Sequence, residues 1–563
     1  MIKWIIFNIL LLIATVSADS FSSLASLKEL IGAERDIPVM INGYVKKELE
    51  RLDYLKKFAE EVQEHNNKAI QDGAEAIKHP INAFLLIKEM TMDWNKVIKI
   101  MRSNSADDFI RNLTRQRIDK RINYPTEVDL AGVVNGLLRL QDTYQMDTKD
   151  IAEGKILNSK MRTVALTAED CFEIGRAAYN EHDYYHTILW MQEAQKRVQN
   201  ETKPTVDSND ILEYLAYSLY KQGNLKRALL LTDELYRRNP DHPRARNNVR
   251  WYEDLLEYEG VRPIDMRRKV PLINNPRDKN AVDSYVFRTY EALCRHEIPI
   301  DIKIQSRFYC YYKMDHPYLR LAPFKVEIVH QNPLAVLFHD IISDEESQII
   351  ETLAIPKLHR ATIHNAATEN LETASYRISK SSWLKSSEHE VVERIDKRLG
   401  LATNLYVESA EELQVQNYGI GGHYEPHLDC SKISAIFCKL GTGNRIATAL
   451  IYMSEPEIGG RTVFIDTRRS VPCTKNAALF WYNLMRSGAV DMRSLHAACP
   501  VLTGIKWTAN KWFHEKGQEW RRPCGLHKSD QERYVGDLGA PEPKYHLNIR
   551  SKAKKSKRMS KKR

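Results

Sequence analysis

Apart from its first residues, the sequence of 563 residues contains no hydrophobic run that approaches the roughly 20 residues a membrane-spanning helix needs. The run from Trp4 to Val16 is too short, and it lies between Lys3 and the small residues of Val16-Ser-Ala18. A basic start, a short apolar stretch and small residues at the cleavage point are typical of a secretory signal peptide. We therefore predict that residues 1–18 are a signal peptide cleaved after Ala18, and that the mature protein is soluble, without a transmembrane segment.

The body of the chain also lacks a net charge. The formal charge of +9 at pH 7 is matched by nine Lys and Arg residues, with no acid, between Arg550 and Arg563. Charge therefore gives no indication of nucleic-acid binding, and we predict no nucleic-acid partner. We expect residues 526–563 to form a disordered, solvated basic tail, with binding to acidic partners or membranes as the alternative.

Cysteine is scarce, with eight residues in the chain, but a protein of the secretory pathway can form disulfides from them. Cys294 lies close to Cys310 in sequence, and Cys499 lies close to Cys524. We expect the other cysteines to be free, partly buried thiols: Cys171, Cys430, Cys438 and Cys473.

What the sequence does contain is a set of side chains suited to metal binding. His427 and Asp429 are two residues apart, so in an extended segment both project from one face. With the distant His496 they would form a three-ligand face with open positions, which suits a non-haem Fe(II) oxygenase better than a closed, thiolate-rich structural zinc site. A His-x-Asp pair alone is a weak signal in a chain with 18 histidines and 74 acids. Three glycines that allow a tight turn precede the pair: Gly419, Gly421 and Gly422.

The segment from His496 to Lys506 adds a second element to this pattern. It predicts two short strands around a turn at Thr503-Gly504. In such a hairpin Lys506 would lie opposite Val501, roughly 16 Å along the ladder from His496. A small dicarboxylate that chelates a metal at one end would about fill this gap, so we predict that Lys506 is the counter-ion of its far carboxylate.

The first part of the mature chain, residues 19–145, is predicted to be helical because no stretch alternates with the period of a strand. Steps of four and three residues relate seven positions, all apolar but one: Ile41, Val45, Glu48, Leu52, Leu55, Ala59 and Val62. This spacing predicts a coiled-coil seam, which Pro38 should break or begin. The alternative is a helix packed within its own domain.

Residues 163–260 are predicted to contain a repeat of helix pairs. Apolar residues and a proline lie at the offsets of a tetratricopeptide repeat: Leu212, Leu215, Ala216, Leu219, Ala228, Leu235 and Pro240. A weaker copy begins 41 residues earlier, at Cys171. Stacked helix pairs form a concave surface, and aromatic residues on it would suit a polyproline II chain, although aromatics at helical spacing are also common in a core.

Residues 261–330 are charged and contain prolines, and we predict a linker there. Residues 331–525 are predicted to hold short strands separated by turn residues, among them 447–452, 461–465, 477–482 and 506–513. Many short strands of this kind indicate a jelly-roll. The predicted fold class is multidomain α+β, with a helical or coiled-coil region, a tetratricopeptide-like domain and a C-terminal jelly-roll, or double-stranded β-helix, domain.

Several motifs closely resemble the α subunit of animal collagen prolyl 4-hydroxylase. In the C-terminal third they are Tyr424-Glu-Pro-His-Leu-Asp429, Leu440-Gly-Thr-Gly-Asn-Arg-Ile-Ala-Thr448, Phe480-Trp-Tyr-Asn-Leu484, His496-Ala-Ala-Cys-Pro500 and Arg521-Arg-Pro-Cys524. Earlier in the chain they are Asp170-Cys-Phe-Glu173, Tyr184-Tyr-His-Thr187 and Leu138-Arg-Leu-Gln-Asp-Thr-Tyr144. The resemblance extends over residues 20 to 525, and the basic tail departs from the family pattern.

The resemblance implies an oxygenase that uses Fe(II), O2 and 2-oxoglutarate, with L-ascorbate as reductant of the iron. Such chemistry is needed because proline C4–H is unactivated, so no side-chain acid or base can remove its hydrogen. The implied iron ligands are His427, Asp429 and His496. Lys506 would pair with the distal carboxylate of 2-oxoglutarate, Tyr418 would donate a hydrogen bond to this cosubstrate, and His514 would lie near it.

The family's peptide-substrate-binding domain corresponds to residues 163–260 and implies a groove for procollagen-like chains with X-Pro-Gly sequences. The groove positions are Tyr179, Tyr214, Tyr217, Arg244, Asn248 and Trp251. Trp251 replaces the usual tyrosine, and Glu213 replaces the usual aspartate. Two alternatives remain: a non-catalytic receptor for proline-rich chains, or a prolyl or lysyl hydroxylase of non-collagen substrates.

The resemblance also implies disulfides, partners and a location. It implies the pairs Cys294–Cys310 and Cys499–Cys524, self-association through the N-terminal helices, and an α2β2 tetramer with protein disulfide isomerase as the β subunit. The chain has no C-terminal Lys-Asp-Glu-Leu signal, so that partner would retain it in the endoplasmic reticulum lumen. Asn112-Leu-Thr114 and Asn200-Glu-Thr202 are glycosylation acceptors suited to this compartment.

Overall fold

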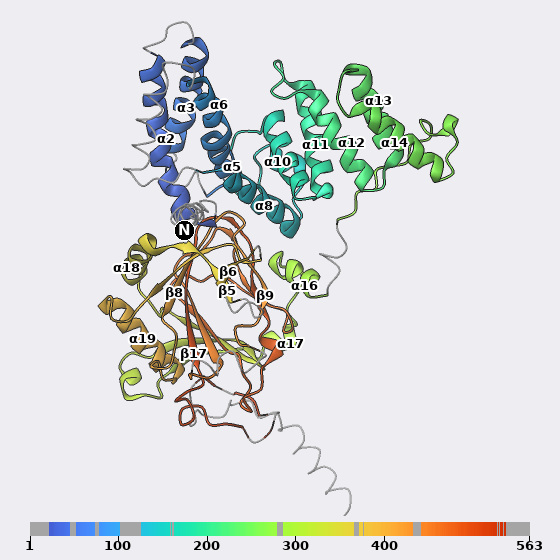
Figure 1. Ribbon diagram of the computed structural model, residues 1–563. Helices are drawn as coiled ribbons and strands as arrows, with labels where there is room; N and C mark the ends of the chain where they lie inside the picture. The colour runs from blue at the N-terminus through green and yellow to red at the C-terminus, as the bar shows by residue number, and fades with distance from the viewer. Residues whose placement is uncertain are drawn as a thin grey trace, which may run out of the picture.

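The computed structural model places a helical N-terminal half above a C-terminal half built on β-sheet, and a helical arm extends to one side (Figure 1). It describes residues 22–45, 52–71, 73, 78–101, 125–157, 159, 163–277, 285–364, 371–374, 376–431, 441–525, 527, 530–532 and 534–535. The predicted signal peptide, Asn112, Cys438 and most of the predicted basic tail lie outside these residues. No helix among the described residues has the length and apolar composition that membrane crossing requires.

The first two described helices, α2 (Leu24–Val45) and α3 (Leu52–Gln71), pack side by side. The predicted seam is therefore divided between two helices of one chain: Ile41 lies on α2 and Leu55 on α3, and both are buried in the same core. An amphipathic stripe is stabilised by any apolar face it meets, and here that face is the neighbouring helix. The prediction for Pro38 was wrong, because α2 contains this residue and continues to Val45.

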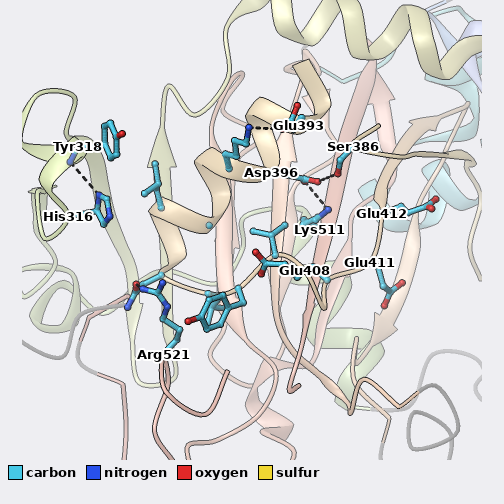
Figure 2. Close-up of a pocket in the computed structure, with 18 of the residues that line it drawn as sticks. His316, Tyr318, Ser386, Glu393, Asp396, Glu408, Glu411, Glu412, Lys511 and Arg521 are labelled. Carbon is cyan, nitrogen blue, oxygen red and sulfur yellow. Dashed lines mark hydrogen bonds and ion pairs between the residues drawn. The ribbon is translucent and has the colours of Figure 1, made fainter. Parts of the chain in front are cut away.

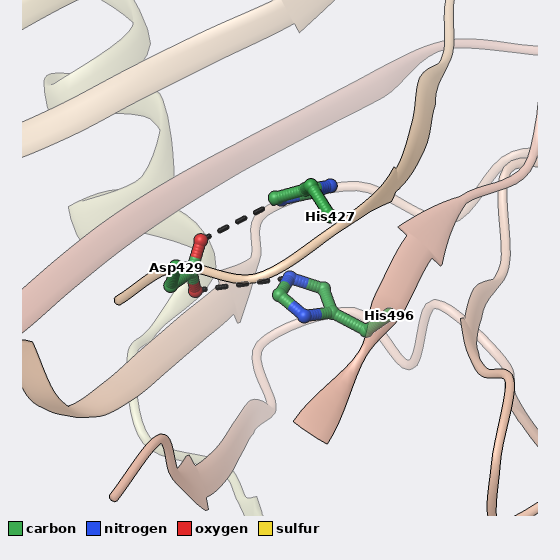
Figure 3. Close-up of side chains that lie close together, drawn as sticks. All are labelled: His427, Asp429 and His496. Atoms are coloured by element: carbon green, nitrogen blue, oxygen red, sulfur yellow. Dashed lines mark ion pairs between the residues drawn. The ribbon is translucent and has the colours of Figure 1, made fainter. Parts of the chain in front are cut away.

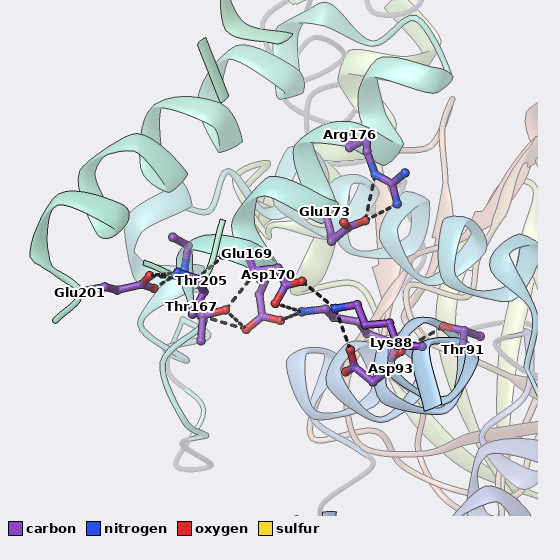
Figure 4. A network of polar contacts seen from close by, with 12 residues as sticks. Lys88, Thr91, Asp93, Thr167, Glu169, Asp170, Glu173, Arg176, Glu201 and Thr205 are labelled. Atoms are coloured by element: carbon purple, nitrogen blue, oxygen red, sulfur yellow. Dashed lines mark hydrogen bonds and ion pairs between the residues drawn. The ribbon is translucent and has the colours of Figure 1, made fainter. Parts of the chain in front are cut away.

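A third helical segment joins these helices to the arm. It consists of α5 (Pro80–Lys88), the π-helical turn η2 (Glu89–Asp93) and α6 (Trp94–Met101). The Nζ of Lys88 donates to Oδ1 of Asp170 at 2.6 Å, and both side chains are buried (Figure 4). The other carboxylate oxygen of Asp170 accepts from the Thr167 backbone in the capping box that begins α10. One carboxylate thus fixes the start of the arm and its contact with the end of α5.

The arm has the predicted architecture of paired helices, each packed on the next. Its helices are α10 (Ala168–Asn180), α11 (Tyr184–Asn200), α12 (Ser208–Lys221), α13 (Leu225–Arg238) and α14 (Ala245–Tyr258). Residues at the repeat offsets, such as Leu212, Leu219 and Ala228, are buried between them. Asn200, a predicted glycosylation site, is exposed at the end of α11.

Helix α8 (Glu127–Tyr144) connects the helical half to the β half, and the short α9 (Thr148–Ala152) follows it. The Tyr144 hydroxyl donates to the carbonyl of Pro500 at 2.7 Å, and an Arg139 guanidinium nitrogen donates to the carbonyl of Gly421 at 3.1 Å. Both acceptors lie in loops of the β domain. The N-terminal helices are therefore anchored on that domain through α8.

The predicted linker contains α16 (Tyr285–Cys294) and α17 (Ile302–Gln305). The disulfide that the structure forms here is not one of the two predicted pairs. Cys294 forms a disulfide with Cys499, with the two Cα atoms 5.6 Å apart, whereas Cys310 and Cys524 are exposed free thiols. The physical reason is that α16 packs on β9, β12 and β13, which brings Cys294 to the strand end that carries Cys499. Cys171, Cys430 and Cys473 are buried free thiols, as predicted.

The β half consists of two main sheets. Among the described residues, the larger sheet has nine strands in the order β1-β2-β3-β14-β10-β17-β8-β7-β4. Its bounds are β1 (Cys310–Lys313), β2 (Phe324–Gln331), β3 (Leu334–His339), β4 (His359–Arg360), β7 (Lys380–Leu384), β8 (Leu413–Tyr418), β10 (Arg445–Tyr452), β14 (Ala478–Tyr482) and β17 (Lys506–His514). Because β1 and β2 belong to this sheet, the β domain begins before the predicted boundary at residue 331.

The smaller sheet has four described strands in the order β13-β12-β15-β9. Its bounds are β9 (Tyr424–His427), β12 (Thr462–Phe464), β13 (Arg469–Val471) and β15 (His496–Ala498). Two further described pairs are β5 (Thr362–His364) with β6 (Leu371–Thr373), and β11 (Ile458–Gly459) with β16 (Val501–Thr503). The four strands that the sequence predicted correspond to β10, β12, β14 and β17.

The hairpin predicted around Thr503-Gly504 is not formed. β16 pairs with β11, and β17 lies in the larger sheet between β10 and β8, so Lys506 is opposite Tyr418 rather than Val501. Both edges of β17 are occupied by longer partners, which leaves no edge for the short β16.

Two helices, α18 (Asp344–Ala354) and α19 (Glu390–Thr403), cover the outer face of the larger sheet, on the left in Figure 1. Alternate residues of β17 point toward them, including Trp507, Ala509 and Phe513. The intervening residues of β17 therefore face the smaller sheet.

Candidate metal and cosubstrate site

The structure brings His427, Asp429 and His496 together at one end of the smaller sheet (Figure 3). β9 and β15 are antiparallel neighbours, and His427 is the register partner of His496. Asp429 follows two residues after His427, just beyond the end of β9. Strand pairing thus supplies the long-range contact that the sequence spacing left open.

The geometry of this group is that of a preformed ligand set. The Nε2 of His427 is 3.5 Å from Oδ1 of Asp429, and the Nε2 of His496 is 3.7 Å from Oδ2. One ligand atom from each residue lies within 4.8 Å of the other two. Two imidazoles and one carboxylate, with the remaining positions open, fit a non-haem Fe(II) centre.

Backbone carbonyls hold both imidazole rings in orientation. The Nδ1 of His427 is 2.7 Å from the carbonyl oxygen of Glu425, and the Nδ1 of His496 is 2.9 Å from that of Ser494. Each carbonyl can only accept, so Nδ1 carries the proton and Nε2 presents its lone pair. Both free lone pairs face the same point as the Asp429 carboxylate.

The local charges favour the ligand-competent protonation states. Burial would raise the pKa of Asp429, but His496 and His427 outweigh it and hold that pKa well below its usual range. Burial, followed by His427, lowers the pKa of His496 to about 4. At neutral pH Asp429 is therefore a carboxylate and His496 a neutral imidazole, as metal binding requires.

A second layer of hydrogen bonds positions the carboxylate, and sequence reasoning did not identify it. The Thr448 hydroxyl on β10 donates to Oδ2 of Asp429 at 2.7 Å, and the Asn483 amide donates to the Thr448 oxygen at 2.9 Å. Both donors are buried. The Leu440–Thr448 motif could have indicated this contact, because the hydroxyl of a buried threonine needs a hydrogen-bond partner.

The cavity beside these residues lies between the two sheets and contains Lys506 and Tyr418. Lys506, Thr508, Asn510 and Trp512, alternate residues of β17, line it, in accord with the two-residue period of a strand. Lys506 thus faces the same cavity as His496, but from the opposite sheet.

Lys506 is buried in the cavity and its side chain can carry a positive charge. Its side chain is 1% exposed, and its Nζ donates to the carbonyl of Gly460 at 2.6 Å and lies 4.5 Å from the centre of the Tyr418 ring. Burial lowers its pKa. Within the described part of the chain no carboxylate forms an ion pair with Lys506, so a dicarboxylate cosubstrate that enters the cavity would supply the missing charge.

Tyr418 lies in this cavity as predicted, whereas His514 does not line it. The Nε2 of His514 is 3.0 Å from Glu411, which also pairs with Arg445. Arg445 in turn donates to the backbone carbonyl of Asp429 at 3.2 Å. His514 is thus linked to the site through Glu411 and Arg445.

A larger surface pocket lies on the other face of the larger sheet, between α19 and the loop at residues 404–412 (Figure 2). There Lys511 of β17 pairs with Asp396 of α19 at 2.8 Å, and Ser386 also donates to Asp396. Lys511 follows the opposite alternation from Lys506, which explains why one strand serves two separate pockets.

The predicted groove residues of the arm form a partly exposed aromatic surface. The Tyr179 ring centre is 4.8 Å from that of Tyr214 and 5.7 Å from that of Tyr217. Trp251 is 39% exposed, and its ring centre lies 4.7 Å from that of Tyr220. The sequence prediction did not include Tyr220 among the groove residues, although it lies three positions after Tyr217 and so on the same side of the helix.

The polar groove candidates lie near the aromatic ones. Arg244 is exposed and pairs with Glu213 at 2.6 Å, so the glutamate at this position reaches the arginine. Asn248 is half-buried on α14, one turn beyond Arg244.

Three family models match consecutive parts of the chain. The N-terminal region of the prolyl 4-hydroxylase alpha subunit matches residues 23–158, the prolyl 4-hydroxylase peptide-substrate-binding domain matches residues 168–258, and the 2OG-Fe(II) oxygenase superfamily matches residues 413–514. These matches follow the helical half, the arm and the β half in turn.

Individual relatives are similar over nearly their whole length. Prolyl 4-hydroxylase subunit alpha-1 of Caenorhabditis elegans is 55% identical over 96% of this chain and 97% of its own. Prolyl 4-hydroxylase subunit alpha-1 of Homo sapiens is 43% identical over 93% of this chain and 98% of its own. The solved viral collagen prolyl hydroxylase of Paramecium Bursaria Chlorella virus-1, in complex with 2OG, is 25% identical over 32% of this chain and 94% of its own, with a TM-score of 0.26.

Proposed function

The chain belongs to the prolyl 4-hydroxylase α-subunit family, and on this basis we propose that it hydroxylates C4 of proline in X-Pro-Gly sequences of procollagen-like chains. It is an Fe(II)- and 2-oxoglutarate-dependent dioxygenase. The observation that supports the proposed chemistry is that the His427, Asp429 and His496 group and the buried cation Lys506 share one cavity.

Each residue of the site has a distinct task in the proposed mechanism. His427 and His496 would hold Fe(II) through Nε2, and Asp429 would hold it through a carboxylate oxygen, while Thr448 keeps this carboxylate in place. When bound, Fe(II) would supply the oxidative chemistry that the unactivated C4–H bond requires, with O2 as oxidant and with 2-oxoglutarate converted to succinate and CO2. The side chains of this protein would hold the reactants in position in the cavity between the two sheets.

Lys506 binds the distal carboxylate of 2-oxoglutarate in this proposal. A charge-assisted contact of a buried ammonium with a carboxylate contributes about 1.5–3 kcal/mol, or roughly a factor of ten to a hundred in affinity. Tyr418 lies against the lysine and adds a buried hydroxyl to the same wall of the cavity. Apolar neighbours in the lining, such as Leu450 and Trp481, leave Lys506 as the main source of selectivity for an anion.

The aromatic surface of the arm is the proposed docking site of the peptide. A proline-rich chain in the polyproline II conformation presents ring faces and solvated carbonyls, and flat aromatic side chains bind it without a large ordering cost. Tyr179, Tyr214, Tyr217 and Trp251 would contact the proline rings. Arg244 and Asn248 would donate to peptide carbonyls.

The remaining features of the proposal come from family membership. We propose that the chain assembles with protein disulfide isomerase as an α2β2 tetramer in the endoplasmic reticulum lumen, and that L-ascorbate reduces its oxidised iron. Self-association through the N-terminal helices completes this assembly. Co-purification from a secretory extract tests the assembly, and a stable, active chain without a partner would contradict it.

The experiment that tests the proposed reaction measures succinate release with different peptides. Repeats of X-Pro-Gly should stimulate release, and hydroxyproline should form in equal amount. Release with lysine-containing or non-collagen proline peptides alone would change the substrate class. Binding of proline-rich peptides without any succinate would indicate a non-catalytic receptor.

A further inference from the structure

A second group of metal-ligating side chains lies in the N-terminal helices, far from the cavity between the sheets. Glu34 projects from α2, His65 from α3, and Glu89 from the first position of η2. The Nδ1 of His65 is 2.9 Å from Oε1 of Glu34 and 2.7 Å from Oε2 of Glu89. One ligand atom of each residue lies within 4.8 Å of the other two.

The hydrogen bonds within this group leave one carboxylate incompletely satisfied. A single proton on Nδ1 of His65 is shared between two carboxylates. Glu34 has a fully buried side chain, and its Oε2 has no hydrogen-bond partner. An unpaired carboxylate oxygen in an apolar interior is costly, so the group is suited to a ligand that contacts both carboxylates.

The charges point to a ligand with more than one positive charge. Hydrogen bonds to Glu34 and Glu89 raise the pKa of His65 to about 10, so at neutral pH an imidazolium faces the two acids. Burial raises the pKa of Glu89 to about 7, so near neutral pH this carboxyl is partly protonated, and a divalent ion could replace both this proton and the one on Nδ1 of His65. Within the described part of the chain, His65 is the one cation paired with either carboxylate.

The neighbouring lysine does not pair with these carboxylates. Lys88 immediately precedes Glu89, but its ammonium pairs with Asp170 of α10 and lies toward the arm (Figure 4). The π-helical turn begins at Glu89, and the two consecutive side chains point to different neighbours: Lys88 contacts α10, whereas Glu89 contacts His65 of α3. Single π-helical turns inside α-helices are frequent at functional sites.

We propose that Glu34, His65 and Glu89 form a binding site for a divalent transition-metal ion, with Zn²⁺ as the best match. One imidazole and two carboxylates are ligands that Zn²⁺ accepts, whereas Ca²⁺ and Mg²⁺ prefer six or more oxygens. Two carboxylates and a neutral imidazole balance the charge of the ion, and Oε2 of Glu34 gains the partner it lacks. The ion would join α2, α3 and η2, and so stabilise the N-terminal helices rather than take part in hydroxylation.

The site leaves one coordination position to solvent. The side chains of His65 and Glu89 are 32% and 15% exposed, so water can reach the ion from their side. Binding replaces the proton on Nδ1 of His65 and the fraction of a proton that Glu89 holds, so between one and two protons are released per ion near neutral pH. This release distinguishes coordination from weak association with surface carboxylates.

The test uses the full chain in its native assembly, with the first site disabled by the triple substitution His427→Ala, Asp429→Ala and His496→Ala. Equilibrium dialysis with Zn²⁺, followed by elemental analysis, should find one tightly held ion per chain. His65→Gln and, separately, Glu89→Gln should each weaken this binding at least tenfold. The matched control His359→Gln, at an exposed histidine of β4, should leave it unchanged.

Two further readouts keep the test decisive. Zn²⁺ should raise the midpoint of thermal unfolding by about 5 °C in the triple variant but not after Glu89→Gln is added. Titration calorimetry in two buffers should report between one and two released protons per ion. The proposal is overturned if the triple variant retains no zinc, or if its zinc content and thermal shift survive both His65→Gln and Glu89→Gln.

Discussion

Gly136 of α8 and Gly421 of the loop before β9 pack against each other with no room for a side chain. A Cβ on Gly421 would lie 2.4 Å from the carbonyl oxygen of Gly136, and one on Gly136 would lie 2.6 Å from that of Ile420. The same loop leads to His427. The position of a ligand strand in the β half therefore depends on a helix of the N-terminal half.

Gly136→Ala tests this dependence, because two effects of the substitution oppose each other. Alanine in a helix interior is more favourable than glycine by about 1 kcal/mol, whereas the clash with the Ile420 carbonyl costs about 1–3 kcal/mol. We expect a net loss of stability and a higher iron concentration for half-maximal activity. Thermal unfolding and iron titration measure both, with Val128→Ala, at a residue 63% exposed on the same helix, as control. A more stable, fully active Gly136→Ala protein would show that the contact has no influence.

Lys506→Ala should raise the KM for 2-oxoglutarate at least tenfold while metal binding survives. The reason is that the substitution removes the ammonium that faces the cavity but leaves the three ligands in place. Kinetics at varied 2-oxoglutarate, together with iron titration, separate the two effects. An unchanged KM would remove the assigned role of Lys506.

Thr448→Val should weaken iron binding by about 10- to 100-fold, the usual effect of losing a partner of a metal ligand. Valine has the shape of threonine but cannot donate to Oδ2 of Asp429. Thr448→Ser keeps the hydroxyl and should restore most of the affinity. If valine and serine variants have the same iron dependence, the hydrogen bond does not position the carboxylate.

The contact between α8 and the arm should weaken at alkaline pH. Burial opposes protonation of His186, but hydrogen bonds to Asp142 of α8 and Asp183 raise the pKa of His186 to about 9. A group whose pKa is raised on folding stabilises the protein fully below its unfolded value near 6.5, and this stabilisation is lost as pH rises through 9. We expect a loss of about 3 kcal/mol between pH 6.5 and 9.5.

Denaturant titration of the wild type and His186→Gln across this range measures that loss. Glutamine does not titrate, so the difference in stability between the two proteins should shrink as pH rises. Arg277, which pairs with Asp142 at 2.9 Å, stays charged throughout and does not contribute to the change. A difference that is independent of pH would contradict the assignment.

Local patterns predicted much of the fold and part of the site. The strands β10, β12, β14 and β17 and the paired helices of the arm follow from period and turn residues, which act over a few positions. His427 and Asp429 share a face for the same local reason. Strand alternation also explains why Lys506 and Lys511 of one strand serve different pockets.

The errors concern contacts between distant segments. The sequence around Thr503 suggested a hairpin, but β17 pairs with β10 and β8. This pairing depends on strands that are distant in sequence. Cys294 pairs with Cys499 rather than with its neighbour in sequence because α16 packs on the smaller sheet. An apolar stripe at Ile41 and Leu55 does not specify whether its partner is the next helix or a second chain. Short-range spacing carries no information on any of these choices.

The most direct test of the central claim compares the wild type with Asp429→Ala for bound Fe(II) and for succinate release that depends on an X-Pro-Gly peptide. The wild type should hold one Fe(II) per chain at this site and form succinate and hydroxyproline in equal amounts, and the variant should do neither. Peptide hydroxylation that persists in Asp429→Ala, or a wild type that retains no iron and forms no hydroxyproline with all reagents supplied, would contradict it.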